Sequence, residues 1–527
     1  MNRKKILSHI LPYILLIIGM CAVISQKENL HVDGFYTYGL SNHPYMGSIG
    51  MNPVEGRVYV PAESAWMEYL SVQENHRFDY VNVWKNQEAD VHPPLYYALV
   101  HTVCSFFPGT FSIWYAGCIN ILFGCLTLYA AGKLIRELTG EDRGILLFSA
   151  AFALSPGILS AAAFLRMYMM AMFFVTFVSW LFVRIWKHGS CRKCLTAAGI
   201  SCAMGVLTHY YFLVWLFFLC AAVGLALLYR KRFCELFQLA ASVSAGILGG
   251  VILFPRMIYH IFLEKGDRGA ESVEKLRYMG VSENVQKLKD YFGYLNDQLF
   301  GKLFLAAVIL VLAAVAVSAA GKTAKTDRNR VREKMEPWLL LLIPCFCYYV
   351  LIARISVYTA DRYIQPIYGV VLTLGLGGVL TACKVLFRDK KVSALLTLCF
   401  FMAVTVNGLR ICPWEYLYRE DGILLDELEA YTGADCLYVY DADDPSRIQH
   451  SYFEGKLFGS VFFVSDEHLE LAAESGILEK SSLLLCTDYA TGGEKTVEEI
   501  LESSNRLQNS VCLGKYGFYT TTWYLSE

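Results

Sequence analysis

The stretch "ADVHPPLYYALVH" (Ala89–His101) decides how the rest of the chain crosses the membrane. It joins a polar start, with Asp90 and His92, to two prolines and an aromatic and aliphatic run that has the composition of a short membrane span. Counting it as a crossing would reverse every later connection and place the basic loops outside, against the usual bias of Lys and Arg toward the cytoplasm. We therefore predict a surface helix on the outer face of the membrane, with Pro93 and Pro94 in its first turn.

The composition is that of an integral membrane protein. Hydrophobic residues make up 55% of the 527 residues and charged residues 18%, which is more apolar than a typical soluble domain. The formal net charge of −1 gives no indication of a nucleic-acid partner. No Cys/His pattern indicates a metal site. Four cysteines of the polar C-terminal part could pair, and their spacing does not decide it: Cys412, Cys436, Cys486 and Cys512.

Long apolar runs recur, and we predict eleven membrane spans. The basic start, Arg3–Lys5, places the N-terminus in the cytoplasm, and the first run is kept as an uncleaved helix because no convincing cleavage site follows it. Lys and Arg then recur at alternate connections, near residues 133–143, 184–193, 230–232, 322–334 and 384–391. The predicted spans are 6–24, 112–134, 144–161, 165–184, 194–208, 210–229, 235–254, 302–320, 338–353, 364–384 and 392–409.

The outer side of the membrane then carries two large segments, a first loop at 25–111 and a tail from 412. The tail alternates short apolar runs with helical stretches, which is typical of a small α/β domain. The predicted fold is a polytopic α-helical membrane protein with a small extracytoplasmic α/β domain at its C-terminus. Its domains are 1–411 and 412–527, and its location is the plasma membrane.

Polar and aromatic residues gather at the predicted outer ends of the spans. Each has an ordinary explanation, such as a turn or helix cap for Asp33 and His92, contact with lipid phosphates for the arginines, or an interfacial aromatic belt for the tyrosines. Their recurrence on one side favours a site. The candidates are Asp33, Asp90, His92, Arg166, Tyr168, His209, Tyr210, Tyr211, Arg354, Asp361, Arg362 and Tyr363.

This set of side chains suits one class of substrate. A carboxylate can take a proton from an acceptor hydroxyl. Arginines bind phosphate through paired hydrogen bonds and stabilise it as a leaving group. Aromatic rings pack against sugars and lipid chains. A polyprenyl-phosphate sugar offers a lipid tail, a phosphate and a sugar to these groups.

Five motifs carry a resemblance to a known superfamily: "DGFYTYG", "DVHPPLYY", "RMYMM", "THYYF" and "TADRYIQPIYG". Over 1–411 the chain resembles the C-type polytopic membrane glycosyltransferases, in particular the bacterial relatives of protein O-mannosyltransferases and aminoarabinose lipid A transferases. The resemblance implies transfer of a sugar from a polyprenyl phosphate to an acceptor hydroxyl or amine on the outer face, with inversion. The implied partners are that donor, membrane lipid and a lipid, glycan or protein acceptor.

The resemblance also implies roles for single residues. Asp33 matches the catalytic acid and is the expected general base. Arg362, together with Arg166 or Arg354, is expected to bind the donor phosphate. The expected pocket residues are Asp90, His92, Tyr168, His209, Tyr210 and Tyr363.

One departure concerns metal binding. Gly34 follows Asp33 where many relatives have a second acid, so a divalent metal ion is left open, with Glu63, Asp79 and Asp90 as alternative acids. The run "DADD" (Asp441–Asp444) is interpreted as a polar loop after a strand.

Two other functions stay open. A transporter or flippase for lipid-linked saccharides is disfavoured, because the spans show neither inverted repeats nor ionisable residues near their middles. A non-catalytic assembly protein that binds polyprenyl phosphate is compatible with Gly34 in the place of the second acid.

Overall fold

The computed structural model describes residues 3–51, 53–59, 64–140, 142, 144–262, 275–320, 325–517 and 519–527. Glu63, Arg143 and the start of the basic stretch 322–334 lie outside these residues. The chain forms two compact units, each assembled from separate segments. The helical unit comprises Met1–Val23, Val91–Tyr96 and Gly117–Trp414, and the mixed unit comprises Ile24–Asp90, Tyr97–Ala116 and Glu415–Glu527.

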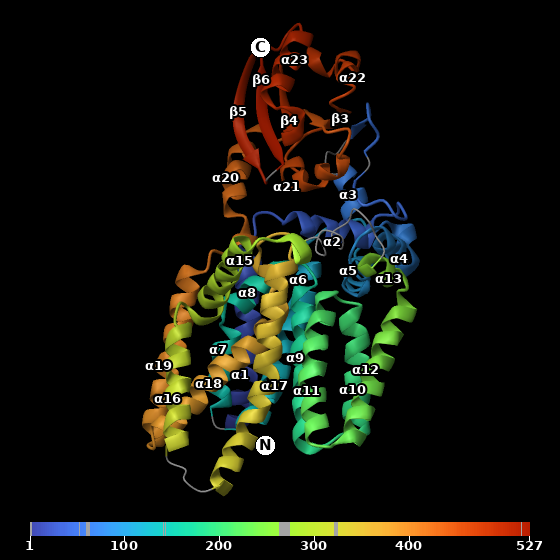
Figure 1. Ribbon diagram of the computed structural model, residues 1–527. Coiled ribbons are helices and arrows are strands. Elements are labelled where there is room, and N and C mark those ends of the chain that lie inside the picture. Colours follow the sequence, from blue (N-terminus) through green and yellow to red (C-terminus); the bar gives the residue numbers. More distant parts are fainter. Residues whose placement is uncertain are drawn as a thin grey trace. The chain divides into compact units, whose positions relative to one another are not determined.

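The helical unit is built from long apolar helices, as expected where no water can bond to the backbone. Helices α9, α11 and α17 run side by side in it (Figure 1). Its helices are α1 (Arg3–Ile24), α6 (Ile113–Thr139), α7 (Ile145–Ala153), α8 (Pro156–Ala163), α9 (Tyr168–His188), α10 (Arg192–Val206), α11 (Tyr211–Tyr229), α12 (Phe233–Leu253), α13 (Arg256–Phe262), α15 (Val281–Tyr294), α16 (Phe304–Ala320), α17 (Lys325–Ile355), α18 (Tyr368–Leu386) and α19 (Lys390–Ile411).

Within the described residues, seven helices are long and apolar enough to cross a membrane, and two bent helix pairs raise the number to nine. Each of the eleven predicted runs contains a helix, but a count of eleven spans is not confirmed. Helix α10 has 15 residues, fewer than the roughly 20 that cross a bilayer. The break between α7 and α8 precedes Pro156, whose ring removes a helical hydrogen bond.

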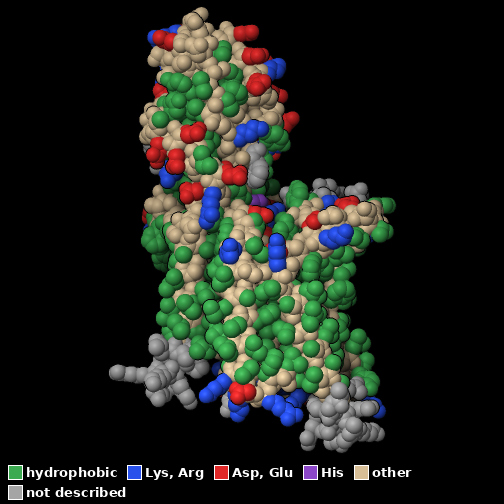
Figure 2. All heavy atoms as spheres, turned by 90° about the vertical axis from the view of Figure 1, so that its left-hand side faces the viewer, with side chains coloured by type: hydrophobic (Ala, Val, Ile, Leu, Met, Phe, Trp, Pro, Cys, Tyr) green, Lys and Arg blue, Asp and Glu red, His purple; other side chains and the backbone are tan. Residues whose placement is uncertain are grey.

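The apolar surface of these helices supports a membrane location. Figure 2 shows hydrophobic side chains covering most of the visible face of the helical unit, while Lys and Arg side chains lie toward both ends of it. The chain is therefore a multi-pass membrane protein.

The stretch that opens the first loop forms α5 (Leu95–Ser105). At 11 residues it is about 16 Å long, too short to span a bilayer. This agrees with its prediction as a helix that does not cross the membrane, whereas its place on the outer surface stays a prediction. The helix begins directly after Pro94, so both prolines precede it rather than occupy its first turn.

The mixed unit combines the first loop with the C-terminal part of the chain. The loop forms α2 (Val32–Asn42), α3 (Ser64–Leu70) and α4 (Tyr80–Ala89). The C-terminal part contains α20 (Arg419–Leu428), β2 (Cys436–Tyr440), β3 (Val461–Ser465), β4 (Ser482–Asp488), α23 (Glu494–Ser503), β5 (Asn509–Tyr516) and β6 (Thr520–Ser526). The predicted α/β organisation of the tail is confirmed.

A six-stranded sheet runs in the order β1-β3-β2-β4-β6-β5. Strands β2, β3 and β4 are parallel and almost fully buried, which explains why their sequences are continuous apolar runs. The edge strand β1 (Val58–Tyr59) comes from the first loop and pairs antiparallel with β3. The first loop thus contributes a strand to the sheet of the C-terminal part.

Candidate functional site

Four predicted site residues lie together in the helical unit, and we call them the basic–aromatic cluster: His92, Arg166, Tyr168 and His209. Arg166 occupies the break between α8 and α9 and is 2% exposed. Its Nη2 atom lies 3.4 Å from Nε2 of His92. The His209 ring lies with its centroid 6.0 Å from that of His92 and 5.1 Å from that of Tyr168. Residues from three separate chain segments therefore surround one guanidinium.

The cluster has one permanent positive charge. His209 precedes α11 and is buried, and this burial, with the nearby charges of His92 and Arg166, holds the pKa of His209 well below its usual value. The His209 ring is therefore neutral near pH 7. Arg166 supplies the positive charge, and the neutral His209 ring offers polar nitrogen atoms without adding a second charge.

Arg362 and Tyr363 adjoin the cluster through shared aromatic rings. The Arg362 guanidinium lies 5.9 Å from the centroid of the Phe164 ring and 5.2 Å from that of Tyr363. Phe164 stacks on Tyr168 with 5.5 Å between centroids, and the Tyr363 ring lies 5.7 Å from that of Tyr211. Arg166 and Arg362 thus border one aromatic wall, an arrangement that suits a phosphate carrying a hydrocarbon tail.

A buried polar network holds the segment that carries Arg362. Oδ2 of Asp361 accepts hydrogen bonds from Nε2 of Gln298 at 2.9 Å and Nε2 of Gln365 at 3.3 Å. The Tyr368 hydroxyl donates to Oε1 of Gln298 at 3.0 Å. Gln298 sits in a π-helical turn, Leu295–Leu299, a form of helix that is rare and common at functional sites.

Asn120 holds the segment that carries Arg166 through a second set of buried hydrogen bonds. Its amide donates to the carbonyl oxygens of Ala162 and Phe164, each at 3.0 Å, and its Oδ1 accepts a hydrogen bond from the Tyr96 hydroxyl at 2.8 Å. These bonds occupy the carbonyls left open at the C-terminal end of α8. They fix the turn from which the Arg166 side chain emerges.

Three predicted site residues make other contacts. Arg354 donates two hydrogen bonds to the carbonyl oxygen of Leu276, at 3.3 and 3.1 Å. The Tyr210 hydroxyl lies 2.9 Å from Nδ1 of His260, so it turns to α13 while its neighbour His209 joins the cluster. Asp90 belongs to the mixed unit, where it caps the C-terminal end of α4.

Asp33 also belongs to the mixed unit, in the first turn of α2. Its backbone N–H donates to Nδ1 of His31 at 3.0 Å, and its carboxylate oxygen lies 3.5 Å from the same nitrogen. The N-terminal end of a helix favours a negative charge. The carboxylate is half-buried, so a ligand can reach it while the end of the helix stabilises its negative charge.

Side chains from the C-terminal part surround this end of α2. The rings of Phe35 and Tyr36 lie 5.4 and 6.1 Å from that of His450, and His450 stacks on Tyr519 at 4.9 Å. Burial lowers the pKa of His450 to about 3, although the Asp33 charge acts in the opposite direction. This end of α2 therefore carries a group of aromatic rings, which suit the faces of a sugar.

The whole chain was compared with known protein families, curated proteins and solved structures. No protein-family model matches the chain, and no curated protein matches it. Its structure is similar to that of ArnT from Cupriavidus metallidurans bound to undecaprenyl phosphate, with a TM-score of 0.55 and 10% identity over 98% of this chain and 97% of that chain. For ArnT in the apo state the TM-score is 0.51, with 11% identity over 97% of each chain. This chain has the C-type glycosyltransferase fold.

The predicted fold is therefore confirmed. The structure also shows the surroundings of other acids considered for metal binding, Asp79 and the "DADD" loop. Within the described residues, no group of three or more His, Cys, Asp or Glu side chains is arranged to hold a metal ion. Asp79 caps α4 by accepting a hydrogen bond from the Asn82 N–H. Arg447 forms ion pairs with Asp441 and Asp444, each at 3.2 Å, so these carboxylates of the "DADD" loop serve a local contact.

Several residues near the predicted site residues of each unit were not foreseen. Asn120 and Gln298 are lone amides beside apolar runs, a sequence signal that our prediction did not use. His450 and Tyr519 had no detectable signal, because no local pattern links residues more than 400 positions from α2 to that helix.

Proposed function

We propose that the chain is a glycosyltransferase that moves a sugar from a polyprenyl phosphate to an acceptor hydroxyl or amine. The observation that carries the proposal is the basic–aromatic cluster, in which the buried Arg166 lies against imidazole and phenol rings next to the ends of membrane helices. A planar guanidinium binds phosphate through paired hydrogen bonds. The crystal structure of ArnT with undecaprenyl phosphate supports a polyprenyl phosphate as the lipid.

Arg166 and Arg362 bind the donor phosphate in this proposal, and His92, Tyr168, His209 and Tyr363 line the pocket. Of the two partners considered for Arg362, Arg166 is favoured over Arg354, because the latter is bound to the Leu276 carbonyl. The positive charge compensates the negative charge that develops on the phosphate as it leaves. We assign Tyr210 and Asp90 no part in phosphate binding.

Asp33 is the proposed general base. Its ionised carboxylate accepts the proton of the acceptor hydroxyl or amine while the acceptor atom attacks C1 of the sugar. The bond from C1 to the phosphate oxygen breaks, its electron pair stays with the polyprenyl phosphate, and the configuration at C1 inverts. The N-terminal position of Asp33 in α2 supports the role because it favours the ionised form.

The reaction is proposed for the outer face of the plasma membrane, with the N-terminus in the cytoplasm and the sheet of the mixed unit outside. This orientation follows from the basic connections of the sequence. The acceptor is a lipid, a glycan or a protein, and a requirement for a divalent ion is left open.

The test uses the purified full-length protein in nanodiscs and a panel of radiolabelled sugars linked to undecaprenyl phosphate, with membrane extracts as the source of acceptor. We expect the sugar to be transferred by the wild-type protein and transfer to fall at least a hundredfold with Asp33→Asn. Glu74→Gln, which changes an exposed acid of the same loop, is the matched control and should transfer normally.

Undecaprenyl phosphate binding, measured separately by native mass spectrometry, should persist in Asp33→Asn. Normal sugar transfer by a folded Asp33→Asn protein would exclude Asp33 as the general base. Binding without turnover of any sugar in wild-type protein would instead favour the non-catalytic assembly protein.

A further inference from the structure

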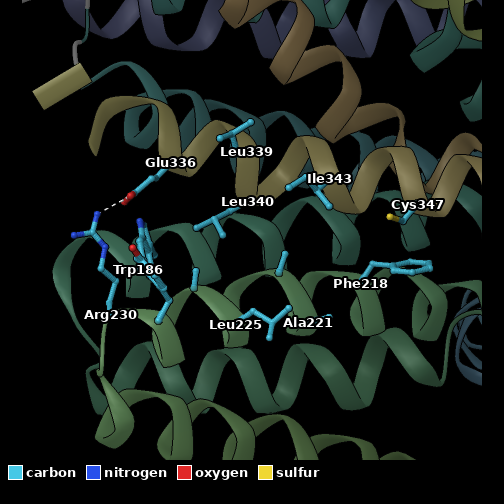
Figure 3. A pocket seen from close by; sticks show the side chains of 13 residues that line it. Trp186, Phe218, Ala221, Leu225, Arg230, Glu336, Leu339, Leu340, Ile343 and Cys347 are labelled. Atoms are coloured by element: carbon cyan, nitrogen blue, oxygen red, sulfur yellow. Dashed lines mark hydrogen bonds and ion pairs between the residues drawn. The ribbon is translucent and has the colours of Figure 1, made fainter. Parts of the chain in front are cut away.

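A hollow between α9, α11 and α17 forms an apolar groove of about 500 Å³ in the helical unit (Figure 3). Trp186, Phe218, Leu225, Leu340 and Ile343 are among its lining residues. Three alanines of α11 also face the groove, and their small side chains leave the space open: Ala221, Ala222 and Ala226.

The groove is separate from the basic–aromatic cluster. Helix α11 begins at Tyr211, next to His209, and the groove reaches Tyr229 at its other end. The 19 residues of α11 correspond to about 27 Å along its axis. A phosphate bound at Arg166 therefore cannot also occupy the far end of the groove.

The walls of the groove face the surroundings of the helices rather than a closed core. Leu225 is 66% exposed and Ile343 is 54% exposed, and both belong to helices that qualify as membrane spans. Outside these helices lies the hydrocarbon of the bilayer, so the occupant with matching chemistry is a hydrocarbon chain.

An ion pair closes one end of the groove. Nη2 of Arg230 lies 2.6 Å from Oε1 of Glu336 (Figure 3), and both side chains are partly accessible. Arg230 follows directly after α11. The two groups offer a hydrogen-bond donor with a positive charge and an acceptor with a negative charge beside one apolar hollow.

We propose that this groove binds a zwitterionic glycerophospholipid of the phosphatidylethanolamine type, with an acyl chain along the alanines of α11. The lipid phosphate bonds to Arg230 and the lipid ammonium to Glu336. An anionic headgroup lacks a partner for Glu336 and is repelled by it, which is why the charge pattern favours a zwitterion. The inference does not depend on the proposed function.

Native mass spectrometry of the delipidated full-length protein tests this inference, with phosphatidylethanolamine, phosphatidylglycerol and undecaprenyl phosphate as separate probes. We expect one phosphatidylethanolamine to bind about tenfold more tightly than phosphatidylglycerol. Ala221→Trp, which fills the groove, should abolish this binding. Ala313→Trp, at an exposed alanine of α16, should leave it intact.

Glu336→Gln provides a second readout that needs no bulky substitution. It leaves Arg230 without its carboxylate, so the preference should move toward phosphatidylglycerol. Equal binding of both phospholipids with no effect of Ala221→Trp would show ordinary annular lipid and overturn the inference. Displacement of phosphatidylethanolamine by undecaprenyl phosphate in wild-type protein, together with loss of that undecaprenyl phosphate binding in Ala221→Trp, would assign the groove to the polyprenyl tail and overturn it as well.

Discussion

The Arg166 guanidinium and the His92 imidazole lie 3.4 Å apart, Nη2 to Nε2, although 74 positions separate them in the chain. The contact joins the turn before α9 to the turn before α5. The imidazole therefore helps to orient the guanidinium of Arg166, which keeps its positive charge at any physiological pH.

Arg166→Lys is expected to weaken undecaprenyl phosphate binding about tenfold or more, because a hydrogen bond to a charged group contributes about 1.5–3 kcal/mol. Lysine keeps the charge but loses the planar fork that binds two phosphate oxygens. Arg354→Lys is the matched variant, since its guanidinium bonds to the Leu276 carbonyl, and it should bind normally. Native mass spectrometry measures both, and equal affinities in the two variants would contradict the assignment.

We predict that the buried Glu454 makes the stability of the folded protein depend on pH. It is fully buried, accepts hydrogen bonds from Thr522 and from Sγ of Cys486, and burial raises its pKa to about 7 from a usual 4.5. The folded state thus holds the proton longer than the unfolded state does. Stability is lost as pH rises from about 4.5 through 7, by about 3 kcal/mol in total.

Glu454→Gln cannot ionise and should escape this loss. Its unfolding temperature relative to that of the wild-type protein should rise between pH 5 and pH 8, as followed by tryptophan fluorescence of the full-length protein. Glu498→Gln, at an exposed position of α23, should keep a constant difference from wild type. A constant difference in Glu454→Gln too would show that the carboxyl group titrates normally.

The proposed orientation predicts which cysteines are accessible from outside the cell. Cys512 on β5 and Cys191 before α10 are both exposed, and the basic connections place them on opposite sides of the membrane. In spheroplasts, a membrane-impermeant maleimide should label a variant that keeps only Cys512 and spare one that keeps only Cys191. Permeabilised cells should label both, and the reverse pattern in spheroplasts would invert the topology.

The helical unit was predictable because its apolar runs are long and its basic residues recur at alternate connections. His92, Arg166, Tyr168 and His209 each lie near the end of a predicted helix, and hydropathy together with the family resemblance was enough to propose them as a group. Hydropathy does not give the direction of a side chain. Tyr210 follows His209 in one motif, yet both residues lie in the turn before α11, and Tyr210 reaches His260 instead.

Contacts between distant segments of the mixed unit were beyond prediction. Strand β1 has two residues, too few for any alternating pattern, and its pairing with β3 depends on a sheet built from the end of the chain. The network of Asp361, Gln298 and Gln365 likewise forms only after three segments pack together. The count of eleven spans is not confirmed, since apolar sequence reveals neither a bend at Pro156 nor the short length of α10.

The pairing of β1 with β3 has a consequence for biosynthesis. About 400 residues separate Tyr59 from Val461, and a ribosome that adds about 5–20 residues per second needs about 20–80 s to produce them. During that time β1 of the first loop has no partner strand, while most of the membrane helices are inserted. A nascent chain that stops before Val461 leaves this edge open to aggregation or proteolysis. Strand β1 can thus pair only after β3 has been synthesised.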